Sequence, residues 1–555
     1  MQKYANIRKM FNHIFISHFL LHITYYLCNI ASGYIAGNYI DSIAVSTTSL
    51  ISPINLIVVN IAYIFAIAGE ILCGKYMGVG DKKSINKAFT NSILFSLIFG
   101  VILTIIFLVF SKEVLLLLDT PEDMFIAAQE YLRGYGLGII AYMLLPILEN
   151  FLHMENEGKH VILSVILLTS VYTGLGLLFF KIFHLSYFAF GLINSISEIV
   201  TVLFLLIKIV KNRDEIRFDI KLADLSCIKQ FITLGLPSGS VGIIKAIRNI
   251  VLNAFLITTG GSLAVAASTI SFDVANLNEA FISSVVQTII IVTSICIGEK
   301  NYDDFVSIIK YFLFYIWPIF TFITIIEIFL SKYICKFFTI DISLLPLAIK
   351  ASRIYLSSNI LEIFCLVMIS AYIVFEYKKF VNTFNIIHCL ILNALFAYLT
   401  MNYLGIYSVF SSYIFTETIC SIIIILFIII KNKKLPSSYE EFALVNDNLE
   451  NINKFNLTLK HIEDIKNLSE DTSLFLQKNG IDHRRSNLSG LMLEELVSNI
   501  FRHGYTKTNN TNPRVDIFAY VQNNEVVIRI RDNSIPFDPT TRFDIFNPED
   551  HSSNV

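Results

Sequence analysis

Charged residues are scarce in this chain. They make up 15% of its 555 residues, whereas 55% of the residues are hydrophobic and 46 are phenylalanine. A soluble chain of this length cannot place so many apolar side chains inside compact cores. Much of the apolar surface must therefore face lipid rather than water.

Several motifs that define large classes of protein are also missing. The eight cysteines occur singly, with no CxxC and no Cys/His cluster, which favours buried apolar thiols over a disulfide framework or a zinc site. No GxxxxGK[ST] loop is present, which argues against an ATP-driven pump. The net charge of −2 gives no sign of a nucleic-acid partner, and we expect none.

Apolar runs of about 20 residues recur along the first 430 residues, and each is long enough to cross a lipid bilayer as a helix. We expect no cleavable signal peptide, because the first run lacks a small-residue cleavage site. We predict a polytopic α-helical membrane protein with about twelve transmembrane helices, near residues 14–36, 50–74, 88–110, 130–151, 160–181, 186–209, 230–258, 265–297, 305–330, 350–374, 379–402 and 407–430.

Lysine and arginine gather in alternate loops, such as residues 75–87, 208–221 and 431–434. Basic loops normally lie on the cytoplasmic side of a membrane. With an even number of spans, both termini are then cytoplasmic. We expect a multi-pass protein of a bacterial plasma membrane, with the lipid bilayer as its first partner.

The two halves of the membrane region echo each other. Gly80-Asp81-Lys82 follows the second span and Gly298-Glu299-Lys300 follows the eighth, and a second pair of similar stretches, at residues 41–46 and 261–266, lies at nearly the same offset. These matches predict a duplicated six-helix unit, whose interface usually holds the substrate path. We predict domains at residues 1–220, 221–434 and 435–555.

Short motifs in the membrane region resemble the multidrug and toxic-compound extrusion (MATE) family. They are residues 69–88 (GEILCGKYMGVGDKKSINKA), residues 115–133 (LLLLDTPEDMFIAAQEYLR), Gly235-Leu236-Pro237 and residues 260–267. The resemblance covers about residues 15–430. It implies two six-helix bundles that alternate between outward-open and inward-open states, and it implies exchange of Na+ or H+ for small organic, often cationic, compounds.

Ionisable residues inside a membrane are costly, so they are the first functional candidates. We single out Glu70, Lys245, Arg248, Asp273 and Glu279 for transport. Further acidic candidates are Glu149, Glu198, Glu362 and Glu417.

The chain departs from the family in two places. Many members carry an acid in the first span, and this chain has none there. Many also carry an acid in the seventh span, where this chain has Lys245 and Arg248. We expect Lys245 or Arg248 to approach Asp273 or Glu279, either as a structural ion pair or as a pair that substrate and proton break.

After residue 434 the composition becomes that of a soluble domain. Helices are predicted at 462–479 and 487–503, and strands at 514–521 and 525–531, which together indicate an α+β domain. Glu495, Asn499 and His503 are spaced i, i+4, i+8, so a helix places them on one face. A carboxylate there can act as a base, and an amide oxygen can bind Mg2+.

A second block, residues 531–539 (RDNSIPFDP), follows the predicted strands. The two blocks in this order resemble the Bergerat-type ATP-binding domain of histidine kinases, gyrase and Hsp90, and above all the anti-sigma-factor serine kinases. The resemblance implies Glu495 as the catalytic base, Asn499 as the Mg2+ ligand and Asp532 as the acceptor for adenine, with His503 and Ser534 also at the nucleotide. Ser534 stands where this family usually has glycine, and no Gly-rich lid precedes Val555, so we expect weak Mg-ATP binding.

Two functions fit the whole chain. In the first, a cation-coupled exporter of small organic compounds carries a tail that binds ATP, phosphorylates serine or threonine, or captures a cytoplasmic protein. In the second, a transporter-like receptor relays the state of a ligand to that tail. Flux without added ATP favours the first, and ligand-dependent phosphorylation without flux favours the second.

Overall fold

The computed structural model describes residues 5–35, 42–117, 120, 122–155, 157–183, 185–211, 216–338, 344–445, 453–505, 513–522 and 525–534. The chain divides into two compact units, residues 11–444 and residues 1–10 with 445–555. We call them the helical unit and the tail unit and treat them separately. Asp41 and residues 535–539, which the sequence analysis used, lie outside the described residues.

The first half of the helical unit consists of helices up to residue 211, and it includes α1 from residue 11 onward. They are α1 (Ala5–Ile35), α2 (Ser42–Val79), α3 (Lys82–Val109), α4 (Ser111–Leu117), α5 (Glu122–Gly136), α6 (Ile139–Met154), α7 (Gly158–Gly176), the π-helical turn η3 (Leu177–Ile182) and α8 (Tyr187–Lys211). α5 and α6 meet at a bend of 50° and together occupy the fourth predicted span.

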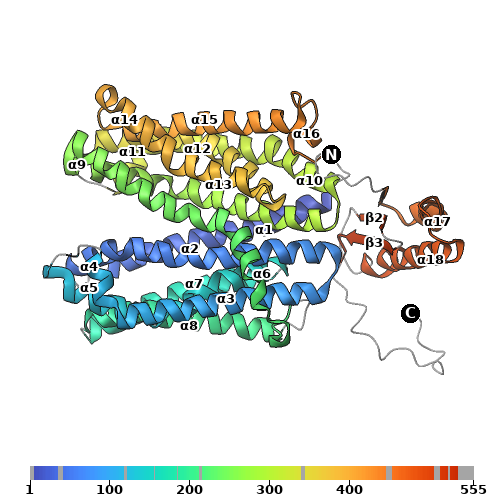
Figure 1. Ribbon diagram of the computed structural model, residues 1–555, viewed down its shortest axis with the longest axis horizontal. Helices are drawn as coiled ribbons and strands as arrows, with labels where there is room; N and C mark the ends of the chain where they lie inside the picture. The colour runs from blue at the N-terminus through green and yellow to red at the C-terminus, as the bar shows by residue number, and fades with distance from the viewer. Residues whose placement is uncertain are drawn as a thin grey trace. The chain divides into compact units, whose positions relative to one another are not determined.

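The second half includes the linker, residues 212–227, that joins it to the first half. Its elements are the short turns η4 (Ile220–Leu222) and η5 (Leu225–Cys227), then α9 (Ile228–Gly298), α10 (Tyr302–Tyr311), η6 (Phe312–Ile316), α11 (Trp317–Phe338), α12 (Leu345–Val374), α13 (Lys378–Ile386), η7 (Ile387–Ile391), α14 (Leu392–Leu404), α15 (Tyr407–Asn432) and α16 (Tyr439–Phe442). The helices of the two halves form two adjacent groups, blue to cyan and green to orange (Figure 1).

α9 consists of two helical arms joined at Gly261. The backbone there has φ 62° and ψ −155°, which is not helical. Only glycine adopts a positive φ of this kind without steric cost. The first arm (228–260) and the second arm (262–298) therefore correspond to two separate predicted spans.

Among the described residues, ten helices are long and apolar enough to cross a membrane, or eleven if the bent pair of α5 and α6 is one span. Every predicted span from the second to the twelfth falls on one of these. The first predicted span falls on α1, a helix of 31 residues. The chain is therefore a mostly helical, multi-pass membrane protein.

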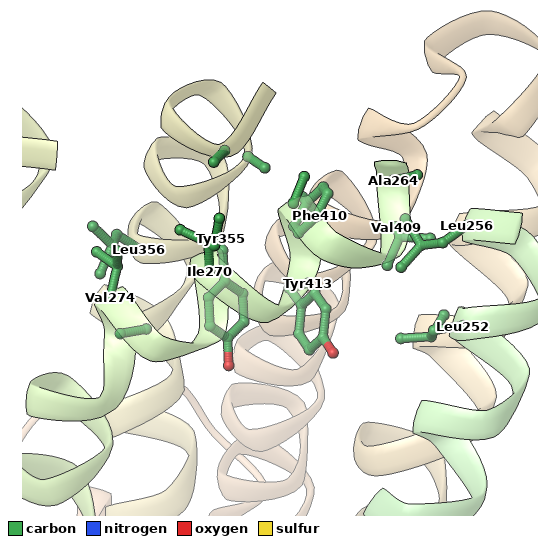
Figure 2. Close-up of a cluster of buried hydrophobic side chains, with 14 of the residues drawn as sticks. Leu252, Leu256, Ala264, Ile270, Val274, Tyr355, Leu356, Val409, Phe410 and Tyr413 are labelled. Atoms are coloured by element: carbon green, nitrogen blue, oxygen red, sulfur yellow. The ribbon is translucent and has the colours of Figure 1, made fainter. Parts of the chain in front are cut away.

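The second half has an apolar core where α9, α12 and α15 meet. Figure 2 shows Leu256 of the first arm beside Val409 of α15, while Ile270 lies beside Tyr355. These side chains are buried, as apolar residues at helix contacts usually are. This core fixes α9 against the helices that carry several of the candidate residues.

The linker between the halves lies along α3. Three of its backbone amides donate hydrogen bonds to α3 side chains: Arg217 N to Asn86 Oδ1 (2.7 Å), Asp219 N to Thr90 Oγ1 (3.0 Å) and Asp224 N to Asn91 Oδ1 (2.8 Å). The Asp224 carboxylate also pairs with Lys87 Nζ at 2.8 Å. The linker is therefore attached to the first half. We call this end of the helical unit the linker end.

The two halves contact each other closely at the linker end. α2 packs there against the second arm of α9 at glycine positions, since a Cβ added at Gly78 would lie 2.5 Å from the backbone nitrogen of Glu299. A Cβ added at Gly298 would lie 2.1 Å from the carbonyl oxygen of Lys75. Lys75 Nζ also pairs with Glu376 Oε1 at 2.6 Å, which joins α2 to the segment after α12. The halves are thus closed together at this end.

The tail unit combines helices with an antiparallel sheet. Its elements are β1 (Lys454–Leu459), the turn η9 (Ile462–Asn467), α17 (Leu468–Lys478), α18 (His483–Asn499), the π-helical turn η10 (Ile500–Gly504), β2 (Val515–Gln522) and β3 (Glu525–Asp532). Among the described residues the strand order is β1-β2-β3. Leu493 and Val497 of α18 pack with Val515 and Ile517 of β2 in a buried core.

The two predicted helices and the predicted hairpin of the tail are confirmed, and with them its α+β class. Asn479 and Gly480 follow α17, as expected, and Gly480 has a φ of 86°. β1 was missed, because six residues of weak alternation become a strand only by pairing with β2, about 60 residues later in the chain. The ATP-binding assignment of this fold remains a prediction.

Candidate functional sites

Three carboxylates lie buried in the first half, and we call them the acidic cluster: Glu70 of α2, Glu149 of α6 and Glu198 of α8. Their side chains belong to residues exposed by only 1%, 5% and 9%. None of the three forms an ion pair with a described basic residue. Uncompensated buried charge is costly, and the cost disappears when a proton or a metal cation binds.

Hydrogen bonds orient two of these carboxylates. The Tyr25 hydroxyl of α1 donates to Glu149 Oε1 at 2.8 Å, and Asn150 Nδ2 donates to Glu70 Oε2 at 2.7 Å. Glu70 Oε1 and Glu198 Oε2 have no hydrogen-bond partner among the described residues. The cluster therefore retains acceptor atoms that a proton or a cation can use.

α1 connects the acidic cluster to the second half. Tyr26, next to Tyr25, accepts a hydrogen bond from Asn276 Nδ2 at 2.9 Å and donates to the backbone oxygen of Asp273 at 3.4 Å. Asn276 and Asp273 belong to the second arm of α9. Neighbouring residues of α1 thus contact the Glu149 carboxylate of one half and the second arm of α9 in the other.

The second half holds a different arrangement, in which both signs of charge occur. We call it the mixed-charge cluster, and its members are Lys245, Arg248, Glu279, Glu362, His388 and Glu417. They come from both arms of α9, from α12, from η7 and from α15. Basic and acidic side chains therefore occur together here, unlike in the acidic cluster.

Two contacts define the interior of the mixed-charge cluster. His388 Nε2 lies 2.7 Å from Glu417 Oε1, and both residues are buried. The Tyr355 hydroxyl donates to Glu279 Oε1 at 3.4 Å. Lys245 interacts electrostatically with Glu279 and Glu362, although none of its described neighbours forms an ion pair with it within 4.0 Å.

The five transport candidates from the sequence fall in three places. Glu70 belongs to the acidic cluster, and Lys245, Arg248 and Glu279 belong to the mixed-charge cluster. Asp273 belongs to neither, since its carboxylate accepts a hydrogen bond from Asn276 at 3.4 Å beside α1.

Among the described residues, neither Lys245 nor Arg248 forms an ion pair with Asp273 or Glu279, so the expected approach to one of these carboxylates stays a prediction. Six residues on a helix turn the side chain by about 240°, so Asp273 and Glu279 face different directions from the same arm.

Two contacts were not anticipated. Glu149 and Glu417 were candidates from the sequence, but their partners Tyr25 and His388 were not. A histidine inside an apolar helix is itself a signal, because burying it without a partner is costly. Its pairing with Glu417 arises from the packing of η7 against α15, which spacing along the chain does not reveal.

In the tail unit, Asn499 Nδ2 donates to Glu495 Oε1 at 3.2 Å, so these two residues share a face of α18 as expected. α18 ends at Asn499 and a π-helical turn, which contains His503, follows. The predicted i, i+4, i+8 row is thus confirmed for Glu495 and Asn499, and the place of His503 in it stays a prediction.

The described end of the second predicted block lies against the end of the first. Asp532 Oδ1 accepts hydrogen bonds from the backbone nitrogen of Ser534, at 2.8 Å, and from its hydroxyl. The Ser534 hydroxyl oxygen lies 2.7 Å from where a Cβ on Gly504 would stand, just after the first block. The fold therefore brings the two blocks together.

Two side chains that the sequence assigned to Mg2+ and ATP keep an oxygen atom without a hydrogen bond among the described residues. The Asn499 side-chain oxygen makes no hydrogen bond within the described residues, so it is available as a metal ligand. Asp532 Oδ2 is likewise available to accept a hydrogen bond. No group of three His, Cys, Asp or Glu among the described residues is arranged to hold a metal ion alone, so any Mg2+ here needs ligands from the nucleotide or water.

Comparisons with curated proteins identify similar chains. The multidrug export protein MepA of Staphylococcus aureus (strain MRSA252) is 26% identical over 277 residues, or 49% of this chain and 60% of MepA. MepA of Staphylococcus haemolyticus (strain JCSC1435) is 26% identical over 267 residues, or 47% and 58%. The chain thus matches about three fifths of the length of these curated relatives.

Solved structures share the fold of the helical unit. An outward-facing multidrug resistance MATE family transporter of the MOP superfamily matches with a TM-score of 0.71 at 19% identity, over 76% of this chain and 96% of that one. A MOP superfamily transporter from Pyrococcus furiosus, described as having a binding pocket of reverse polarity, matches with a TM-score of 0.70 at 19% identity over the same shares. These likenesses concern the fold alone.

The family model MatE matches this chain twice, at residues 19–180 and 237–399, and the two matches begin 218 residues apart. That spacing agrees with the offset between the repeated glycine motifs of the two halves. Because the two matched segments together exceed half of the chain, this chain belongs to the MatE family.

Proposed function

We propose that this chain is a secondary transporter that exports small organic compounds in exchange for H+ or Na+. The acidic cluster carries the proposal, because three buried carboxylates without a basic partner need a cation. Membership of the MatE family and the similarity to multidrug export proteins support the export function. In this proposal the linker end faces the cytoplasm, as the basic loops predict.

α1 supplies the coupling. A hydroxyl binds an ionised carboxylate more strongly than a neutral one, so a proton on Glu149 weakens its bond with Tyr25. Tyr26, one residue later, holds Asp273 and Asn276 of the second half. A change at the cation site therefore reaches the interface between the halves through two adjacent tyrosines.

The test is flux in proteoliposomes without ATP, with ethidium and fluorescein as probes and with either a pH gradient or a Na+ gradient imposed. We expect one gradient to drive transport, and Glu149→Gln to reduce driven transport to the level of empty vesicles. The control is Glu113→Gln, which changes an exposed carboxylate of α4. Flux that ignores both gradients, in protein shown to be folded, would contradict the proposal.

We also propose that the tail unit binds Mg-ATP and acts as a regulatory or kinase-like module with a cytoplasmic protein partner. The support is the approach of the two blocks, with Glu495 placed as the base, Asn499 as the Mg2+ ligand and Asp532 as the adenine acceptor. Bound nucleotide would supply the phosphoryl group, and Glu495 would accept a proton from an attacking hydroxyl.

Mg-ATP titration of the full chain in detergent tests this second proposal. We expect weak, saturable binding that Asp532→Asn and Asn499→Ala abolish. Glu525→Gln, an exposed change at the start of β3, is the control and should leave binding intact. Ligand-dependent phosphorylation without any flux would instead favour the receptor alternative for the whole chain.

A further inference from the structure

We propose that the mixed-charge cluster binds the carboxylate group of an aromatic organic acid, which makes organic anions, rather than simple cations, the transported class. The inference rests on the proposed export function and names its substrate. It depends on which groups of the cluster are already engaged and which are free.

The buried members of the cluster are either paired with each other or hidden from solvent. Glu417 pairs with His388, and Glu362 is exposed by only 6%. The members that keep partial access to solvent are Lys245, Arg248 and Glu279. A ligand that enters the cluster therefore meets two positive groups and one negative group, and the negative group already accepts a bond from Tyr355.

The two positive groups have unused donors. Arg248 donates from Nε and Nη2 to one acceptor, the side-chain oxygen of Asn249, at 3.3 and 3.2 Å. Its remaining N–H groups have no described acceptor, and neither has the ammonium of Lys245. Lys245 and Arg248 are three residues apart, so they share one face of the first arm. A guanidinium with free N–H groups is the preferred partner of a carboxylate.

Aromatic side chains flank these donors. The Arg248 guanidinium lies 5.1 Å from the centre of the Tyr413 ring, and Tyr413 lies 4.8 Å from the Tyr355 ring, edge to face. Phe272 lies 5.0 Å from Tyr355. Rings in this arrangement offer faces and edges to an aromatic ligand.

One hydroxyl among them lacks a partner. Tyr413 is only 4% exposed, and its buried hydroxyl makes no hydrogen bond with a described residue. Such a group costs stability until an acceptor reaches it. Figure 2 shows the hydroxyl oxygens of Tyr355 and Tyr413 pointing to the same side. A ligand carboxylate would satisfy Arg248 and Tyr413 together.

The experiment compares two probes on the full chain in detergent and in proteoliposomes: fluorescein, an aromatic carboxylate, and ethidium, an aromatic cation. We expect saturable fluorescein binding and gradient-driven fluorescein flux. Arg248→Gln should weaken fluorescein binding by roughly tenfold or more, as should Lys245→Gln. The matched control is Arg353→Gln in α12, whose guanidinium binds Ser331, and it should change the Kd little.

A positioning effect is separated from binding by two further readouts. Arg248→Lys keeps the charge and should recover part of the affinity, and thermal unfolding should show that each variant is folded. Glu149→Gln should lose gradient-driven flux while it still binds fluorescein. Driven transport of ethidium without fluorescein, or an unchanged fluorescein Kd in Arg248→Gln, would overturn this inference and leave the export function standing. Movement of neither probe would count against both.

Discussion

Glu149 and Arg248 show how the surroundings of a single ionisable side chain decide its use. Both residues are candidates for the same reason, the cost of charge inside a membrane. Glu149 has a tyrosine hydroxyl as its partner and no described cation, so it suits proton or cation binding. Arg248 has a ring, an amide oxygen and free N–H groups, so it suits an anion.

At the residue scale, a single glycine also allows two helices to pack closely. Gly78→Ala places a methyl group 2.5 Å from the backbone of Gly298 and Glu299, where no side chain can move aside. We expect it to lower the free energy of unfolding of this closed state by roughly 1–3 kcal/mol. Thermal unfolding in detergent measures the change.

Gly174→Ala in α7 is the control for this prediction, because a Cβ there meets nothing within 4 Å. Alanine is the better helix former, by up to about 1 kcal/mol, so this variant should be neutral or slightly stabilised. Equal losses in both variants would show that backbone approach at the linker end is not the cause.

At the scale of elements, side chains of α3 hold the linker through hydrogen bonds to its backbone. Its amides bind Asn86, Thr90 and Asn91, so the polar side chains at the start of α3 serve the linker rather than the substrate path. Hydrogen bonds from Lys87 and then from Ser226 and Cys227 hold the pKa of the Asp224 carboxyl well below its ordinary value.

This lowered pKa predicts a pH dependence with a definite sign. At pH values above the ordinary pKa of an aspartate, about 3.9, the ionised Asp224 carboxylate stabilises the attached linker. This contribution is lost as the pH falls toward the lower pKa of the folded state. Asp224→Asn should therefore reduce hydrogen-exchange protection of the linker amides at pH 7. Wild-type protection should approach the level of the variant only below about pH 4.

Lys221→Gln is the control for the linker, since the Lys221 side chain forms no ion pair within the described residues. Unchanged protection in Asp224→Asn at pH 7 would mean that the amide bonds to α3 alone hold the segment.

Elements differed in how well the sequence predicted them. Long apolar runs predicted the second to twelfth spans, because a bilayer imposes a minimum helix length that composition records directly. β1 and the π-helical turn after Asn499 were missed, since both depend on packing against distant residues.

At the scale of the whole molecule, the ion pair between Lys75 and Glu376 connects the two halves at the linker end. Lys75 of α2 binds Glu376 at 2.6 Å, and Lys378 binds the same carboxylate at 3.3 Å from within the second half. Partial burial acts to raise the pKa of Glu376, but the ammonium groups of Lys75 and Lys378 outweigh it and hold the pKa below its ordinary value.

Glu376→Gln should favour opening at the linker end. An exposed ion pair contributes about 0.2–1 kcal/mol, so the population of the open state should rise by up to roughly fivefold. Cys296 is fully buried in the second arm near this contact and serves as a native reporter. Maleimide labelling of its peptide, followed by mass spectrometry, should be faster in the variant.

Lys378→Gln is the matched control for this prediction, because it removes a contact to Glu376 without removing the bond between the halves. Equally faster labelling of Cys296 in both variants would contradict a role of the Lys75–Glu376 ion pair in holding the halves together.

The sequence by itself determined that the chain spans a membrane, that its membrane region is duplicated and that a separate α+β tail follows. These properties depend on run length, offset and local periodicity, which are written along the chain. Only the tertiary structure decided which ionisable residues stand alone and which are paired. The backbone of Asp273 contacts Tyr26 of α1, and Glu417 pairs with His388. Arg248 lies beside Tyr413 and has N–H groups without a described acceptor. The reason is that a charge takes its partner from neighbouring helices, and helix packing is not encoded in residue spacing.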